Sequence, residues 1–225
     1  MKKKIISFIF VVILAMGMNI TAFAADDIGD NEKNEVDYSM QFEQFIKVAL
    51  ESQDSFLVYN NQDEDVTKQF LKVYYAEGVE KAHEYVKKNE CTLSYQVIEE
   101  NDIESRTTIK VRNVHDTFYK CVTCTDGSYT KEWMMKLTGI YSYNADTGAI
   151  TSARNPTLSI EYANFGAAWI AYMNNVSTNY TITGTNSIKF TGKYHMYGQC
   201  SPPGLDGVSF TKDFKSHTVS FTSTE

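Results

Sequence analysis

The sequence predicts an α+β protein in which an N-terminal helical segment precedes an antiparallel β-sandwich. Residues 37–89 carry apolar side chains at helical spacing, which is typical of amphipathic helices. Residues 91–225 alternate Thr, Ser, Tyr and Val, with turn residues about every eight to twelve positions, which is typical of short antiparallel strands. With 15 Tyr, 13 Phe and only 3 Pro, the chain is suited to a packed core.

Residues 1–24 are expected to be a signal peptide and not part of the fold. A lysine-rich start precedes the apolar run 5–18, and the A-F-A sequence at 22–24 matches the pattern that signal peptidase recognises. Cleavage before Ala25 would make the protein secreted, and an uncleaved signal would be its only expected contact with a membrane. Residues 25–36 are polar and charged, so they are expected to form a flexible leader.

The charge of the chain argues against a nucleic-acid partner. The sequence has 21 basic and 28 acidic residues, and removing residues 1–24 removes three basic residues and no acidic ones, which leaves a net charge of −10. Such a chain repels nucleic acid at long range. The sequence also lacks Walker, GxGxxG, HExxH and GxSxG motifs, so we expect no cofactor and no metal.

Three apolar stripes predict helices within residues 37–89. The last stripe closes with two lysines, which suit the negative end of a helix dipole. The ambiguous apolar run 56–59 fits either a strand or a helix. The stripes consist of Phe42, Phe45, Ile46, Ala49 and Leu50; then Val66, Phe70, Val73 and Tyr74; then Val79, Ala82, Tyr85 and Val86.

The stretch 118–137 is predicted to be the central hairpin of the β domain. Asp126-Gly127 is a strong signal for a two-residue type I′ turn, which needs positive φ at both residues. This turn places Lys120 opposite Trp133 and Phe118 opposite Met135. We expect one face to point to the core and the other mostly to solvent. The predicted core face has Phe118, Lys120, Val122, Cys124, Tyr129, Lys131, Trp133, Met135 and Leu137; the other has Tyr119, Cys121, Thr123, Thr125, Ser128, Thr130, Glu132 and Met134.

The remaining strands are predicted to be short. The run 166–173 fits either a strand or a helical turn, and the Pro- and Gly-rich run 202–207 is expected to be a loop. The predicted strands are Thr92–Glu99, Ser105–Arg112, Thr117–Thr125, Ser128–Thr138, Ile140–Tyr143, Ala149–Ser152, Thr157–Tyr162, Ser177–Thr183, Ser187–Phe190, Lys193–Tyr197, Val208–Lys212 and His217–Thr222.

The four cysteines are interpreted as structural. Three residues along a strand span roughly 10 Å, beyond the reach of a disulfide, so a bond between Cys121 and Cys124 is disfavoured. The strand context and the lack of a second CxxC also disfavour redox catalysis or zinc. Disulfides with Cys91 and Cys200 suit an exported protein, and two pairings remain open. Free buried thiols are the remaining alternative.

Candidates for catalysis are few. A Cys/His hydrolase could use Cys200 with His195 or His217. The acidic residues between 99 and 104 could supply a carboxylate pair for hydrolysis. A solvated acidic turn and ordinary sheet histidines are the simpler interpretations, and we favour them.

Tyrosines are the candidates for binding. Exposed rings on a rigid sandwich can stack on sugars or anchor a peptide. We name Tyr141, Tyr143, Tyr194 and Tyr197 as binding candidates, while packing against the sheets is the simpler role for most tyrosines.

The C-terminal stretch LTGIYSYNADTGAITSARNPTLSIEY, then FTGKYHMYGQC and SHTVSFT, resembles small secreted proteins of Gram-positive bacteria whose C-terminal domain has no assigned activity. The lysine-led signal peptide is similar to theirs. This resemblance covers roughly residues 137–222 and implies secretion from a Gram-positive bacterium, but it assigns no site residues.

The sequence therefore predicts a secreted, non-enzymatic binding module for a cell-surface glycan, a peptide or another protein. The first alternative is the secreted hydrolase described above. The second is a toxin or competition factor whose helical segment would act on a membrane or partner, although that segment lacks the basic face of membrane-surface helices.

Overall fold

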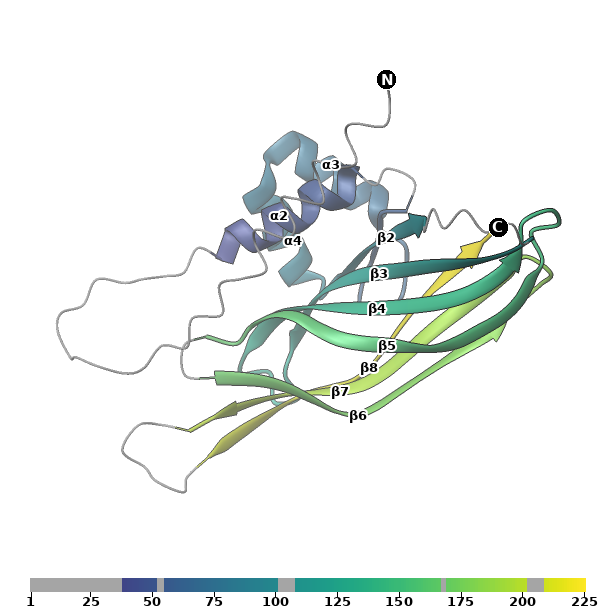
Figure 1. Cartoon of the computed structure of the whole chain (residues 1–225). Helices are drawn as coiled ribbons and strands as arrows, with labels where there is room; N and C mark the ends of the chain where they lie inside the picture. Colours follow the sequence, from purple (N-terminus) through teal and green to yellow (C-terminus); the bar gives the residue numbers. More distant parts are fainter. Residues whose placement is uncertain (1–37, 52–54, 101–107, 167–168, 202–208) are drawn as a thin grey trace, which may run out of the picture. The chain divides into compact units, whose positions relative to one another are not determined.

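The structure, a computed structural model, describes residues 38–225 except 52–54, 101–107, 167–168 and 202–208 (Figure 1). The predicted signal peptide, the leader and the loop at 202–207 lie outside the described residues. Among the helices that are described, none is both long and apolar enough to cross a membrane. In chain order the elements are α2 (Tyr38–Glu51), β1 (Leu57–Tyr59), α3 (Thr67–Glu77), α4 (Val79–Lys88), β2 (Thr92–Glu100), β3 (Ile109–Thr123), β4 (Thr130–Asn144), β5 (Ile150–Asn164), β6 (Trp169–Ile182), β7 (Ser187–Cys200) and β8 (Phe210–Thr224).

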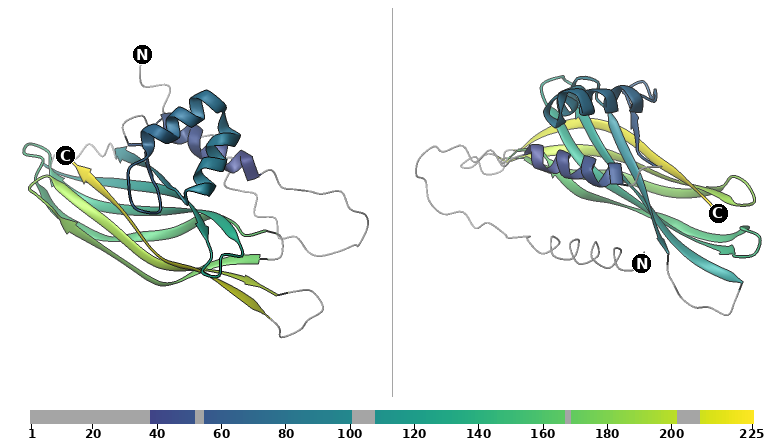
Figure 2. Two further views of the ribbon diagram at one scale, coloured as in Figure 1. Left: turned by 180° about the vertical axis from the view of Figure 1, so that it is seen from behind. Right: turned by 90° about the horizontal axis from the view of Figure 1, so that it is seen from above.

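The strands form two antiparallel sheets. The first has the order β1-β2-β3-β4-β5 and the second the order β6-β7-β8. The second sheet lies on one face of the first, here called the inner face, and the helices cover part of the opposite, outer face (Figure 2). This arrangement confirms the predicted α+β class, with helices before a sandwich-like pair of sheets. The ambiguous run 56–59 contributes strand β1, and the end of the ambiguous run 166–173, from Trp169 on, belongs to strand β6.

The strands are longer than predicted, because several predicted breaks lie inside continuous strands of 14 or 15 residues. Gly139 shows why. It sits in the middle of β4, and the Phe190 ring of β7 occupies the space where a Cβ would lie, 2.5 Å away. Pro156 lies in β5, the edge strand, where a missing N–H need not cost a ladder hydrogen bond. At these two positions glycine makes room for the opposing sheet and proline lies in an edge strand, so neither marks a turn.

The register of the central hairpin is confirmed, whereas its turn type was wrong. Lys120 pairs with Trp133, and Phe118 pairs with Met135. The loop is wider than two residues: Cys124 N donates to Tyr129 O at 2.9 Å, and Gly127 N donates to Cys124 O at 2.9 Å. Gly127 has φ +73, but Asp126 does not have the positive φ that a type I′ turn requires. Instead the Asp126 carboxylate accepts the Ser128 N–H at 3.0 Å.

The expectation that the second face of this hairpin mostly meets solvent holds near the turn, where Thr125, Ser128 and Thr130 are exposed, but it was wrong farther along the strands. Tyr119 is 1% exposed and Cys121 is fully buried. The rings of Phe42 and Phe45 in α2 pack on the Tyr119 ring, at centroid distances of 5.3 and 5.4 Å. The helices need a partner for their apolar stripes, and this face supplies it. Tyr129, expected in the core, is instead 45% exposed just before β4 begins.

Candidate functional site

A groove runs along one side of the sandwich because the two sheets differ in width. β8 lies over β3, β7 lies over β4 and β5, and β6 lies against β5. Within the described part of the chain, no strand of the second sheet covers the inner face of β1 and β2. The resulting groove has a volume of about 550 Å³, within the range of ligand sites.

The groove has a polar floor and one wall made by an edge strand. The alternating inner-face positions of β2 and β3 form the floor, and residues 218–222 of β8 form the wall. Gln96 joins the two, because its Nε2 donates to the Thr222 carbonyl at 3.2 Å. The floor residues are Thr92, Ser94, Gln96, Asp116, Phe118 and Lys120.

Asp116 is the most unusual group of this floor. Its side chain is 6% exposed, and its Oδ1 is buried without a hydrogen-bond partner among the described residues. Burial raises the pKa of its carboxyl well above the usual range, although the backbone N–H groups of Thr117 and Tyr95 oppose that shift. Leaving a buried polar atom unpaired costs about 1–3 kcal/mol, so such an atom in a groove points to a ligand that supplies the missing bond.

Lys120 lies at the other end of the same floor. Its side chain is buried, and its Nζ donates to Thr92 Oγ1 at 2.9 Å. Burial lowers the pKa of its ammonium to about 8, with the charge of Asp63 opposing the shift. Lys120 makes no ion pair with any residue that the structure describes, although an ammonium has three donors. The group can therefore receive an acceptor from a ligand.

This groove was not predicted from the sequence, although a signal for it was present. Asp116 and Lys120 lie on the same face of β3 as the core residues Val114, Phe118 and Val122. Charged residues at core positions of a strand mark either a satisfied pair or a site. The missing information was the width of the second sheet, which single-strand periodicity cannot give.

A second polar cluster joins α4 to the outer face of the first sheet. His83 Nε2 is hydrogen-bonded to Glu132 Oε1 at 2.7 Å, and the Tyr119 hydroxyl donates to Glu132 Oε2 at 2.8 Å. Lys87 approaches the same carboxylate at 3.4 Å. Burial raises the pKa of Glu132, but these partners outweigh it and the net shift is downward. Both carboxylate oxygens are paired, so this cluster serves to hold the helices.

His195 and Cys200 do not come together. Both lie on β7, but Cys200 is on its buried face and His195 is on the opposite one. His195 instead bridges two residues of β8, with Nε2 at 2.7 Å from Asp213 Oδ1 and Nδ1 at 2.8 Å from Ser216 Oγ. This Ser-His-Asp arrangement lies on the outer surface of the second sheet. None of the three residues lines the groove.

His217 is a packing residue. Its ring packs against the rings of Trp133 and Tyr194, at centroid distances of 5.3 and 5.4 Å. Its Nε2 donates to the Phe214 carbonyl at 2.7 Å. Of the predicted carboxylates, Glu99 lies in β2 within 3.8 Å of His115, whereas Asp102 and Glu104 lie outside the described residues.

The tyrosine candidates do not form an exposed row. Tyr141 and Tyr194 are 1% and 2% exposed, and the Tyr194 hydroxyl accepts the Trp133 indole N–H at 3.0 Å. Tyr143 carries the Arg112 guanidinium over its ring at 4.9 Å. Tyr197 stacks with Tyr172 on the outer surface of the second sheet. Burial thus removes two of the four candidates from surface contacts.

The predicted disulfides are not present, because all four cysteines are free and buried. Cys91 and Cys121 belong to the core between the helices and the first sheet, whereas Cys124 belongs to the core between the sheets. The sheet therefore separates Cys124 from Cys91, which rules out one of the two pairings left open. Burial raises the pKa of the Cys91 thiol to about 11 and raises that of Cys121 as well, so neither is a reactive thiolate.

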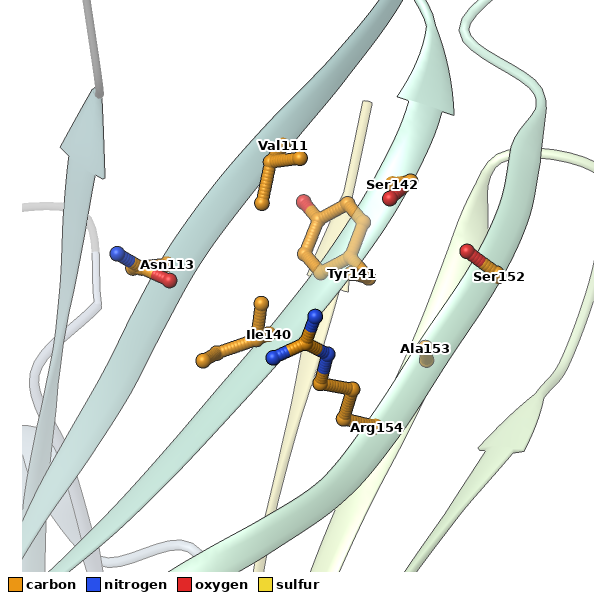
Figure 3. A pocket seen from close by; sticks show the side chains of 8 residues that line it. All are labelled: Val111, Asn113, Ile140, Tyr141, Ser142, Ser152, Ala153 and Arg154. Atoms are coloured by element: carbon orange, nitrogen blue, oxygen red, sulfur yellow. The ribbon is translucent and has the colours of Figure 1, made fainter.

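Another hollow, of about 340 Å³, lies on the outer face of β3, β4 and β5, beyond the helices (Figure 3). Figure 3 shows Arg154 reaching from β5 toward Ile140 of β4. The Tyr141 hydroxyl bonds elsewhere, to Ser223 and Glu225. This hollow has no unpaired buried polar atom among its described residues, so the groove is the better candidate.

In the described ranges, no group of three or more His, Cys, Asp or Glu side chains is placed to hold a metal ion. No protein-family model, curated protein or solved structure matches the chain.

Proposed function

We propose that this protein is a secreted, non-enzymatic binding module that holds a polar ligand in the groove between β2 and β8. The unpartnered Oδ1 of buried Asp116 carries this proposal. An unpaired buried polar atom is costly, and apolar or satisfied residues would be more stable there, so its retention in a groove points to a function. The signal-peptide pattern at residues 1–24 supports secretion.

The decisive variant is Asp116→Asn, which keeps the shape of the side chain and one oxygen for the backbone N–H groups. It replaces an oxygen, which can accept a hydrogen bond, by an NH2 group, which can only donate one. Peptide and glycan arrays probed with the full chain would identify binders, and isothermal calorimetry would give their affinities. We expect D116N to weaken binding at least tenfold without lowering the unfolding midpoint.

The matched control is Asp146→Asn, which makes the same substitution in the exposed turn between β4 and β5. We expect it to bind as the unchanged protein does. Equal binding by D116N and the unchanged protein would place the ligand elsewhere and contradict the proposal.

A hydrolase is the second candidate, because His195 joins Asp213 and Ser216. A hydrolytic site of this type also needs donors for the developing oxyanion and a place for the substrate. Turnover of a generic ester that Ser216→Ala abolishes would favour this candidate over binding alone.

A toxin with a membrane-active helical segment fits less well. Phe42, Phe45 and Ile46 of α2 are buried against the first sheet, so their apolar stripe would have to leave the sheet to act.

A further inference from the structure

The wall of the groove is the free edge of a strand. Within the described residues β8 has one strand neighbour, β7. The Thr222 carbonyl accepts a hydrogen bond from the Gln96 side chain, so this carbonyl points into the groove. Because peptide groups along a strand alternate in direction, those of Thr218 and Ser220 point the same way. Such an edge is a template for an added strand.

We propose that the ligand of the groove is an extended peptide that pairs with the edge of β8 as a fourth strand of the second sheet. This inference rests on the proposed function and names its ligand class. Strands are about 4.7–4.9 Å apart in every sheet. Since β8 lies over β3, a strand added beside it would lie over β2. It would cover the part of the inner face that the second sheet leaves open.

The floor sets the sequence that such a peptide should have. Lys120, Phe118 and Asp116 are alternate residues of β3, each pairing with a β2 residue under the groove. Their spacing of roughly 7 Å equals the spacing of alternate side chains in an extended peptide. Three alternate side chains of one peptide can therefore contact Lys120, Phe118 and Asp116 at the same time.

The two ends of the floor favour different side chains in the bound peptide. The Lys120 ammonium bonds Thr92 of β2 and can receive a carboxylate there. Asp116 Oδ1 lacks a hydrogen-bond partner, and a side-chain amide or hydroxyl can supply one because each can both donate and accept. Phe118 between them favours an apolar side chain. The peptide thus has the pattern acid, any residue, apolar, any residue, amide or hydroxyl, in either chain direction.

The probe is a pair of fluorescein-labelled heptapeptides, Thr-Glu-Val-Leu-Val-Gln-Thr and its reverse sequence, titrated with the full chain by anisotropy. The control peptide moves Glu and Gln one position inward, onto the alternate face. We expect one of the pair to bind at least tenfold more tightly than the control peptide. Loss of that difference would overturn the predicted pattern.

The edge itself is tested by Ser220→Pro against Ser220→Ala. Proline removes the outward N–H but no ladder bond to β7, so an edge strand tolerates it. We expect S220P to weaken peptide binding at least tenfold and S220A less than twofold. A peptide methylated on the backbone nitrogens that face β8 tests the same bonds without changing the protein, and it should also bind at least tenfold more weakly.

The outcomes separate the two proposals. A peptide or glycan whose binding depends on Asp116 but not on S220P or backbone methylation would uphold the groove and overturn strand addition. Binding that none of Asp116→Asn, S220P and backbone methylation changes would overturn both.

Discussion

At the scale of single residues, burial of His217 opposes its protonation. Burial, together with the charges of Lys120, His195 and Lys215, lowers the pKa of His217 to about 3, against the bond to the Phe214 carbonyl. The unfolded chain takes up this proton near the ordinary pKa of about 6.5. The stability from neutral His217 is therefore complete above pH 6.5 and is lost as the pH falls toward 3.

Replacement of His217 by Gln should reduce the acid sensitivity of the fold. Between pH 7 and pH 4 the free energy of unfolding of the unchanged protein should include a loss on the order of 3 kcal/mol from this residue. Urea titrations at both pH values measure the slope, and H217Q should show a smaller fall. The control Thr218→Ala changes no titrating group, so its stability should fall with pH as that of the unchanged protein does. An equal fall for H217Q would contradict the assignment of this acid sensitivity to His217.

At the scale of elements, the register of β3 and β4 could be predicted from alternation and the Asp126-Gly127 signal, although the turn type could not. Alternation fixes which residues share a face, so Cys121 and Cys124 were correctly placed on opposite faces. It does not say what covers each face, so Tyr119 was wrongly assigned to solvent. Likewise the break predicted between Thr138 and Ile140 was wrong, because the sequence does not reveal the Phe190 ring that occupies the space beside Gly139.

Replacement of Gly139 by Ala should destabilise the protein by about 1–3 kcal/mol, since its Cβ would overlap the Phe190 ring and β4 or β7 must shift. Urea unfolding at neutral pH measures the difference. The matched control is Gly184→Ala, whose Cβ meets nothing within 4 Å and which should change stability by less than about 0.5 kcal/mol. Equal effects would show that the sheets have room at Gly139.

At the scale of the whole molecule, the groove depends on a mismatch that no local pattern encodes. Five strands face three, and the polar floor lies where the second sheet ends. The candidate residues Cys200, His217 and Tyr194 were chosen for their chemistry, and all three lie on the inner side of the second sheet. Asp116 and Lys120 gain significance only when the opposing strands are known.

The helices and the first sheet share a core, so residues 91–225 should not fold alone. Phe42 and Phe45 of α2 pack on the sheet, and together they contribute about 3–6 kcal/mol of apolar burial. That amount is a large part of the total stability of a typical domain. A fragment of residues 91–225 should therefore aggregate, whereas residues 37–225 should be soluble and melt cooperatively in circular dichroism. A cooperative melt from the shorter fragment would contradict the shared core.

The order of the strands has a consequence for folding speed. From β2 to β5, and again from β6 to β8, each strand pairs with its neighbour in sequence. Most strand pairs therefore close only short loops, and they can form before the two sheets join. β1 differs, because α3 and α4 lie between it and its partner β2 in the sequence. Because folding rates fall as contacts become more distant in sequence, this protein should fold faster than sandwiches of similar size whose strands cross between sheets.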